Sequence, residues 1–170
     1  VSTDMNEWAD SALGGGFMES YKSDVAAAAD TMQEVAASIG APVLPVKIVA
    51  HPADLDTNHS TIGWYDNTEK GVLHLDARAD ANLAFFGLHE YAHMLDFERW
   101  GNGKFASSNS KSVLSGVMAA IKASPQEKEW RYADNGAYWA SNHEMFARAF
   151  AQYAAEQAGD TMGREASTKT

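Results

Sequence analysis

The sequence predicts an α+β domain with a small, mostly antiparallel sheet, and three observations carry this prediction. Long segments near both ends and in the middle of the chain place apolar residues at every third or fourth position, which is the spacing of helices with a buried face. Three short runs rich in β-branched and aromatic residues lie between the first two of these segments. Helices that are segregated along the chain from a small sheet are typical of this fold class.

The N-terminal part of the chain is expected to form one helix and one strand. Residues 1–16 are expected to be a flexible segment that ends in three glycines, and the apolar repeat of the helix follows over residues 17–39. Gly40 is a typical end for this helix. Residues 46–50 form a short run of β-branched residues, which predicts a buried strand.

The middle of the chain predicts a hairpin and then a long helix. Residues 62–65 and 71–75 are expected to form two strands, joined by a polar turn at residues 66–70. A helix is then expected over residues 81–100, with Asp80 as its N-cap. Because apolar residues occupy more than one side of this helix, we expect it to be buried.

The C-terminal part predicts two further helices. The first is expected near residues 111–122, and residues 123–140 are expected to be irregular. The last helix is expected over residues 141–157, followed by a polar tail at residues 158–170. Residues 17–157 are therefore predicted to form a single domain.

The composition limits the kinds of partner and the kinds of catalytic or metal site that the chain can have. A net charge of −10 argues against nucleic acid or an anionic membrane as the main partner. The absence of cysteine excludes disulfides, thiolate zinc sites and thiol nucleophiles. No apolar run reaches the roughly 18 residues of a membrane span, so we expect a soluble protein. We also expect a monomer, and the sequence leaves its location open between the cytoplasm and delivery into a host cell. Because the chain begins with Val1, we expect an excised domain or a processed product.

The segment from His89 to His93 carries the clearest chemical pattern. Its two histidines are four residues apart, so on a helix both imidazoles lie on one face and can bind one zinc ion. Glu90 lies beside the first histidine, where it can take a proton from zinc-bound water. This is the His-Glu-x-x-His arrangement of zinc peptidases. The alternative is an ordinary buried helix with two hydrogen-bonded histidines.

A catalytic zinc usually has three protein ligands and one open position, so a third ligand is needed. A metzincin would have glycine in place of Asp96 and histidine in place of Arg99, which excludes that class. His143 and Glu144 lie early on a helix whose apolar face can pack beside the first helix. The sequence also fits a capping box from Ser141, in which Glu144 starts the helix and is not a ligand. The residues alone leave both possibilities open.

Two motifs resemble known peptidases. Residues 89–96 (HEYAHMLD) and 144–153 (EMFARAFAQY) resemble gluzincin metallopeptidases. The likeness is greatest to the peptidase-like domain of large polyvalent proteins of phages and mobile elements, and looser to the anthrax lethal-factor-like peptidases. It covers about residues 60–155 and implies a zincin-like fold in which a C-terminal helix supplies Glu144 as the third zinc ligand.

The resemblance also suggests how a substrate is handled. Tyr138 resembles a tyrosine of lethal-factor-like enzymes whose hydroxyl stabilises the oxyanion, although its spacing to the second motif differs slightly. An edge strand of gluzincins pairs with an extended peptide, which by analogy assigns this role to Ile62, Gly63, Trp64 and Tyr65. The alternatives are plain core or surface aromatics and an ordinary edge strand.

Three other residues have two interpretations each. Asp96 is either an acceptor for a ligand imidazole or a solvated helix residue. Arg148, one turn after the second motif begins, either orients the ligand carboxylate or forms a surface ion pair. His74 is more typical of a hydrogen-bonded strand histidine than of a substrate contact.

These observations predict a zinc-dependent metallopeptidase that acts on a peptide or protein substrate. Zinc is expected on His89, His93 and Glu144, with Glu90 as the general base. The alternatives are a zinc-bound but non-catalytic or latent module of a phage or mobile-element protein, and a toxin-type effector peptidase.

Overall fold

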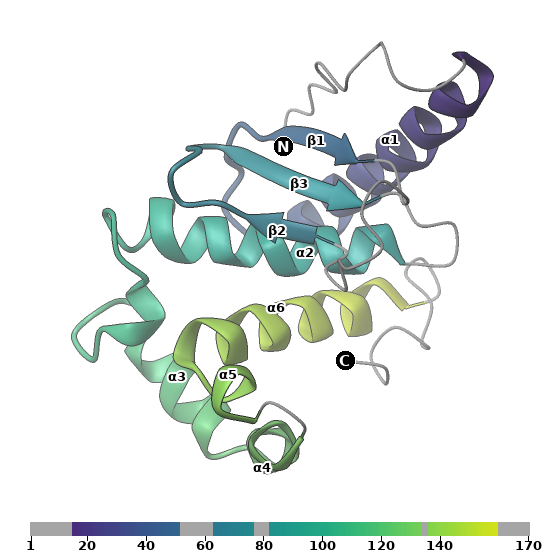
Figure 1. Cartoon of the computed structure of the whole chain (residues 1–170). Coiled ribbons are helices and arrows are strands. Elements are labelled where there is room, and N and C mark those ends of the chain that lie inside the picture. The colour runs from purple at the N-terminus through teal and green to yellow at the C-terminus, as the bar shows by residue number, and fades with distance from the viewer. Residues whose placement is uncertain (1–14, 52–62, 77–81, 134–135, 160–170) are drawn as a thin grey trace.

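The computed structural model describes residues 15–51, 63–76, 82–133 and 136–159 (Figure 1). Within these residues the chain forms six α-helices and one three-stranded sheet, so the predicted α+β class is confirmed. Most of the predicted flexible N-terminal segment and of the predicted polar tail lies outside the described residues. No helix in this part of the chain is long and apolar enough to cross a membrane.

The sheet has the strand order β1-β3-β2. The predicted hairpin is present, because β2 (Gly63–Tyr65) pairs antiparallel with β3 (Val72–Asp76). However, β1 (Lys47–His51) pairs parallel with β3, so the sheet is mixed and the prediction of a mostly antiparallel sheet is wrong. The hairpin could be predicted because its two strands are neighbours in sequence and are joined by a short turn. The pairing of β1 with β3 joins segments that are distant in sequence, so no local pattern predicts it.

Helix α1 (Gly15–Ser38) lies behind the sheet in Figure 1 and packs on α2 (Leu83–Met94). It begins at Gly15, two residues before the predicted start. Val25, Met32 and other apolar residues of α1 are buried against Ile48 and the strands. A methyl group on Gly87 would collide with the Met32 side chain, so glycine allows the two helices to approach closely.

The predicted long helix is present, but it changes type near its end. It continues from α2 into a π-helix at Leu95–Arg99, before Gly101. Its N-cap is Asn82, whose side chain accepts a hydrogen bond from the Phe85 amide at 3.0 Å. The predicted cap, Asp80, lies outside the described residues. π-Helical turns are frequently found at functional sites.

The predicted irregular segment at residues 123–140 contains two short helices, so that prediction is wrong. Pro125 is the first residue of α4 (Pro125–Tyr132). Proline is favourable at this position because an amide N–H in the first turn would have no partner within the helix. Helix α5 (Gly136–Trp139) follows. Helix α4 is short and polar, and α5 has only four residues, so neither produces an apolar repeat. The preceding helix, α3 (Ser115–Lys122), lies within the predicted range.

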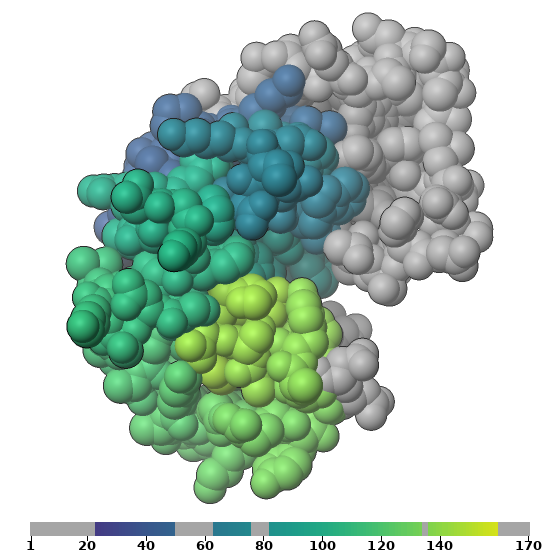
Figure 2. Space-filling model, turned by 60° about the vertical axis from the view of Figure 1, so that its left-hand side comes forward, coloured from purple at the N-terminus to yellow at the C-terminus, as the bar shows by residue number. Residues whose placement is uncertain are grey.

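Helix α6 (Asn142–Ala158) agrees with the last predicted helix and lies beside α2 in Figure 1. Its first half packs on Met118 and Trp130 of α3 and α4 in a second cluster of buried apolar residues. Its second half contributes Ala151 and Ala154 to the main core. On the face in Figure 2, α6 lies between the teal atoms of the sheet and α2 and the green atoms of α3–α5. Helix α6 therefore contributes to both clusters of buried apolar residues.

The position of α2 is also fixed by Tyr91, which is fully buried on the helix that carries both histidines. Its hydroxyl donates to the carbonyl of Pro42 at 2.6 Å and accepts from the amide of Leu44 at 3.0 Å. These bonds tie the segment between α1 and β1 to α2 and satisfy backbone groups that are partly removed from water.

The substitution Tyr91→Phe should lower the free energy of unfolding by about 1–3 kcal/mol, because it leaves these two backbone groups without the hydroxyl. Urea denaturation measures this change. Tyr153→Phe is the matched control, since Tyr153 is 52% exposed, and it should stay within about 0.5 kcal/mol of the wild type. Equal stability of all three proteins would contradict the role assigned to Tyr91.

Candidate metal centre

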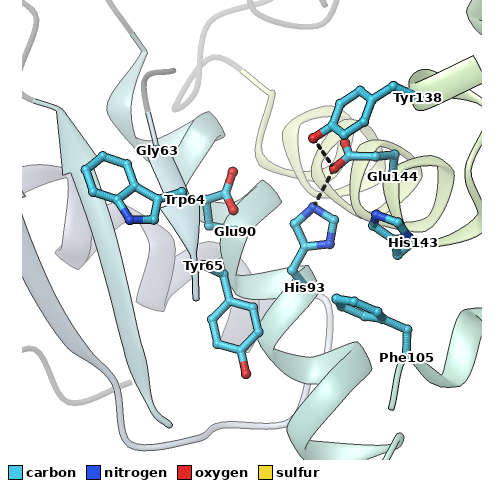
Figure 3. A pocket seen from close by; sticks show the side chains of 9 residues that line it. All are labelled: Gly63, Trp64, Tyr65, Glu90, His93, Phe105, Tyr138, His143 and Glu144. Carbon is cyan, nitrogen blue, oxygen red and sulfur yellow. Dashed lines mark hydrogen bonds and ion pairs between the residues drawn. The ribbon is translucent and has the colours of Figure 1, made fainter. Parts of the chain in front are cut away.

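The two predicted histidines face the predicted carboxylate across the contact of α2 with α6. The Nε2 atom of His89 lies 3.3 Å from Oε2 of Glu144, and the Nε2 atom of His93 lies 3.2 Å from Oε1. All three ligand atoms lie within 4.8 Å of one another. Figure 3 shows the imidazole of His93 directed at the carboxylate of Glu144. The helical spacing predicted from the sequence therefore places both imidazoles at one point.

The donor set fits a zinc ion. Ligand atoms about 2.0–2.2 Å from a tetrahedral zinc lie about 3.3–3.6 Å from one another, which is close to the separations of 3.3 and 3.2 Å between the imidazole nitrogens and the Glu144 oxygens. Imidazole nitrogen and carboxylate oxygen are zinc ligands, and three protein ligands are typical of a catalytic site. In addition, Oε2 of Glu144 is buried without a hydrogen-bond partner among the described residues. A cation at this point would satisfy it.

The structure favours Glu144 over His143 as the third member of the group. In the described part of the chain, the residues that can jointly reach one metal ion include Glu144 and not His143. The capping box is wrong, because Ser141 makes no side-chain cap bond and its hydroxyl has no partner among these residues. His143 instead stacks on Phe105, with ring centroids 4.8 Å apart and planes 16° apart.

The charge of Glu144 is held by its surroundings. Burial, which leaves the residue 3% exposed, would by itself raise the pKa of its carboxyl. The close contacts with His89 and His93, together with the positive charge of these imidazoles when protonated, outweigh burial and hold the pKa of Glu144 well below its usual range. The two imidazoles therefore stabilise the charged form of the Glu144 carboxylate.

Glu90 reaches the same space from α2 without belonging to the ligand group. Burial raises the pKa of its carboxyl to about 7, opposed by the charge of His93 and by a hydrogen bond from the backbone of Tyr65. Figure 3 shows its carboxylate between β2 and His93. A carboxyl group with a pKa near neutrality can both accept and release a proton, which is the requirement for a general acid–base catalyst.

Gly63 allows Glu90 to pass beneath β2. A methyl group at Gly63 would lie 3.2 Å from Cγ of Glu90 and 3.1 Å from Cδ2 of Leu75, closer than ordinary contact distance. Glycine at this position therefore sets the distance between the strand and the carboxylate.

Tyr138 lies on the opposite side of the group from Glu90 (Figure 3). Its hydroxyl donates to Oε1 of Glu144 at 2.7 Å. Burial of the phenol and this hydrogen bond raise its pKa, so the hydroxyl keeps its proton and remains a donor. Although the segment containing Tyr138 was expected to be irregular, the short helix α5 brings this hydroxyl to the site.

A cavity of about 240 Å³ opens beside the group. It is lined by residues of β2, α2, α5, α6 and the loop before Ala106: Gly63, Trp64, Tyr65, Glu90, His93, Phe105, Tyr138, His143 and Glu144. Phe105 was not predicted from the sequence. It lies in a connecting segment with no pattern, and only the fold brings its ring against His143 and within 6.0 Å of the His93 ring.

The predicted edge strand lines this cavity in part. Ile62 lies outside the described residues, and Gly63 faces Glu90. Trp64 points away from the ligand group in Figure 3 and stacks on His74, with ring centroids 4.7 Å apart. The hydroxyl of Tyr65 donates to Glu98 at 3.0 Å. Gly63, Trp64 and Tyr65 therefore all line the cavity, and the backbone of Tyr65 also hydrogen-bonds Glu90.

Asp96 and His74 each have a clear position. Asp96 is fully buried, so its interpretation as a solvated residue is wrong. It accepts hydrogen bonds from the amide and hydroxyl of Ser107 and so holds the loop that carries Phe105. No hydrogen bond joins it to His93, whose Nδ1 lacks a partner among the described residues. His74 lies 3.2 Å from Glu69, as expected for a hydrogen-bonded strand histidine.

No known protein family, curated protein or solved structure matches this chain. The function must therefore be inferred from the geometry and chemistry of the site.

The substitution Glu144→Ala should weaken zinc binding by at least about 100-fold, because it removes a ligand and the anion that balances the metal charge. Metal analysis after dialysis against a weak chelator measures the loss. His143→Ala should keep one zinc per chain, as should Glu156→Ala, an exposed carboxylate on the same helix. Zinc retained by Glu144→Ala and lost by His143→Ala would move the third ligand to His143.

Proposed function

We propose that this chain is a zinc-dependent metallopeptidase of the gluzincin type with a zincin-like fold. The observation that carries the proposal is the convergence of His89, His93 and Glu144, with the carboxyl of Glu90 beside them in one cavity. The resemblance of the two motifs to gluzincins supports the same conclusion. Two imidazoles and one carboxylate with an adjacent buried acid form the set that metal-assisted hydrolysis requires.

His89, His93 and Glu144 would hold the zinc ion. When bound, zinc would lower the pKa of a water molecule and polarise the carbonyl group of a substrate. The contact of α2 with α6 fixes the relative positions of the three ligands, since two ligands come from one helix and the third from the other. The site therefore depends on the helix packing and not on a loop.

Glu90 accepts a proton from the attacking water and passes it to the leaving amine. Its pKa of about 7 suits both transfers near neutral pH. The backbone of Tyr65 binds one part of its carboxylate and limits how the group can turn. This leaves the other part for proton transfer.

Tyr138 supplies a hydroxyl donor on the other side of the reacting carbonyl. In the structure this hydroxyl is bonded to Glu144, and a shift of the donor to the developing oxyanion would stabilise the transition state. By analogy with gluzincins, β2 would bind an extended peptide through main-chain hydrogen bonds.

The substitution Glu90→Gln should lower peptidase turnover by about 10²–10⁴-fold, because the amide cannot accept the proton, while one zinc per chain is retained. A mixed peptide library analysed by mass spectrometry provides substrates without assuming a sequence preference. Glu34→Gln, an exposed site on α1, is the control and should leave turnover unchanged. Full turnover by zinc-loaded Glu90→Gln would rule out the proposed mechanism. Absence of turnover by the zinc-loaded wild type would favour the non-catalytic zinc module.

The substitution Gly63→Ala should lower turnover by about 10- to 100-fold with zinc retained, because the added methyl group displaces Glu90. The measurement is the rate on a peptide that the wild type cleaves. Gly116→Ala is the matched control, since a methyl group there meets no atom within 4 Å. If both variants cleaved the peptide at the wild-type rate, Gly63 would have no part in positioning Glu90.

A further inference from the structure

Arg148 is a buried cation behind the site. It lies one helical turn after Glu144 on α6 and is 5% exposed. Its guanidinium carbon lies 3.8 Å from the ring centroid of Trp139 and 6.0 Å from that of Trp130. The interpretation of Arg148 as part of a surface ion pair is therefore wrong. A cation in this position is stabilised by the aromatic faces and by nearby negative charge.

Trp139 directly follows Tyr138 on α5, which connects the arginine to the site. Helix α5 has four residues, none of them buried, and so short a helix is not stable on its own. Its side-chain contacts with α6 include the stack of Trp139 on Arg148 and the hydrogen bond from Tyr138 to Glu144. Trp139 also packs against the second cluster of buried apolar residues, to which α6 contributes. The ring of Tyr138 also lies edge-on to Trp139, with centroids 4.8 Å apart.

We propose that Arg148 is a positioning residue that holds α5 on α6 through Trp139 and thereby keeps the hydroxyl of Tyr138 at the site. The part of this inference that concerns catalysis rests on the proposed peptidase function. Both Arg148 and Glu144 belong to α6, so the distance between the stack and the ligand is fixed by one helix. Tyr138 is 53% exposed and has little packing of its own.

The guanidinium has a second effect, which comes from its charge. Burial lowers the pKa of Arg148, and the negative charge of Glu144 opposes this change. The cation therefore also stabilises the ligand carboxylate. Lysine would keep the charge but lose the planar face that stacks on Trp139. The two effects can thus be separated by substitution.

Hydrogen exchange of the metal-free protein tests the positioning directly. Millisecond labelling and mass spectrometry should show exchange about 5- to 30-fold faster at residues 136–141 in Arg148→Met, Arg148→Lys and Trp139→Leu, with α2 unchanged. The amides of Ala140 and Ser141, which donate to Gly136 and Tyr138, report this change. Lys128→Met, an exposed cation on α4, is the control.

A double-mutant cycle tests the consequence for the site. Arg148→Lys should lower turnover at full zinc occupancy, and combining it with Tyr138→Phe should add little to the loss caused by Tyr138→Phe alone. Unchanged exchange at residues 136–141 would overturn the proposal. So would a double variant whose loss of turnover equals the product of the fold-losses of the two single variants. If the wild type cleaves no peptide, the peptidase proposal fails, and the exchange result still decides whether Arg148 holds α5. Far-UV circular dichroism identifies any variant that does not fold, and Arg148→Lys is the least disruptive of the set.

Discussion

The carboxylate of Glu144 lies buried between two imidazoles, and the other parts of the site are arranged around this contact. A buried anion is costly unless cations or hydrogen-bond donors surround it. Here the imidazoles of His89 and His93 reach it only because α2 and α6 lie side by side. The apolar faces of both helices hold them together, so hydrophobic packing fixes the geometry of a polar site. The separations between the imidazole nitrogens and the Glu144 oxygens are compatible with ligands around one zinc ion.

Strand β2 and helix α5 place the remaining residues of the site around this contact. From one side, β2 approaches α2 so closely that a methyl group at position 63 would press on Glu90, whose carboxylate lines the cavity. From the other side, α5 brings the hydroxyl of Tyr138 to Glu144. The acid and the hydroxyl donor therefore face each other across the ligands. This arrangement suits a reaction in which one group moves protons and the other stabilises negative charge.

The sequence predicts best the features that depend on neighbouring residues. The apolar repeats of α1, α2 and α6 and the four-residue spacing of His89 and His93 are local, and the structure contains these helices and brings the histidines together. The third member of the metal-binding group could be predicted only from the resemblance of the second motif to gluzincins, because the residues alone did not distinguish Glu144 from His143. The parallel pairing of β1, the wall formed by Phe105 and the stack of Arg148 on Trp139 join segments without a shared local pattern. Helices α4 and α5 were missed because both are too short to show an apolar repeat.

X-ray absorption at the zinc edge of the purified, zinc-loaded protein tests the central claim most directly. Multiple scattering from imidazole rings counts the histidine ligands independently of any activity. The account predicts two imidazoles, one carboxylate and one exchangeable oxygen ligand, all about 2.0–2.2 Å from zinc. A third imidazole, or four protein ligands with no exchangeable position, would contradict an open catalytic site built on His89, His93 and Glu144.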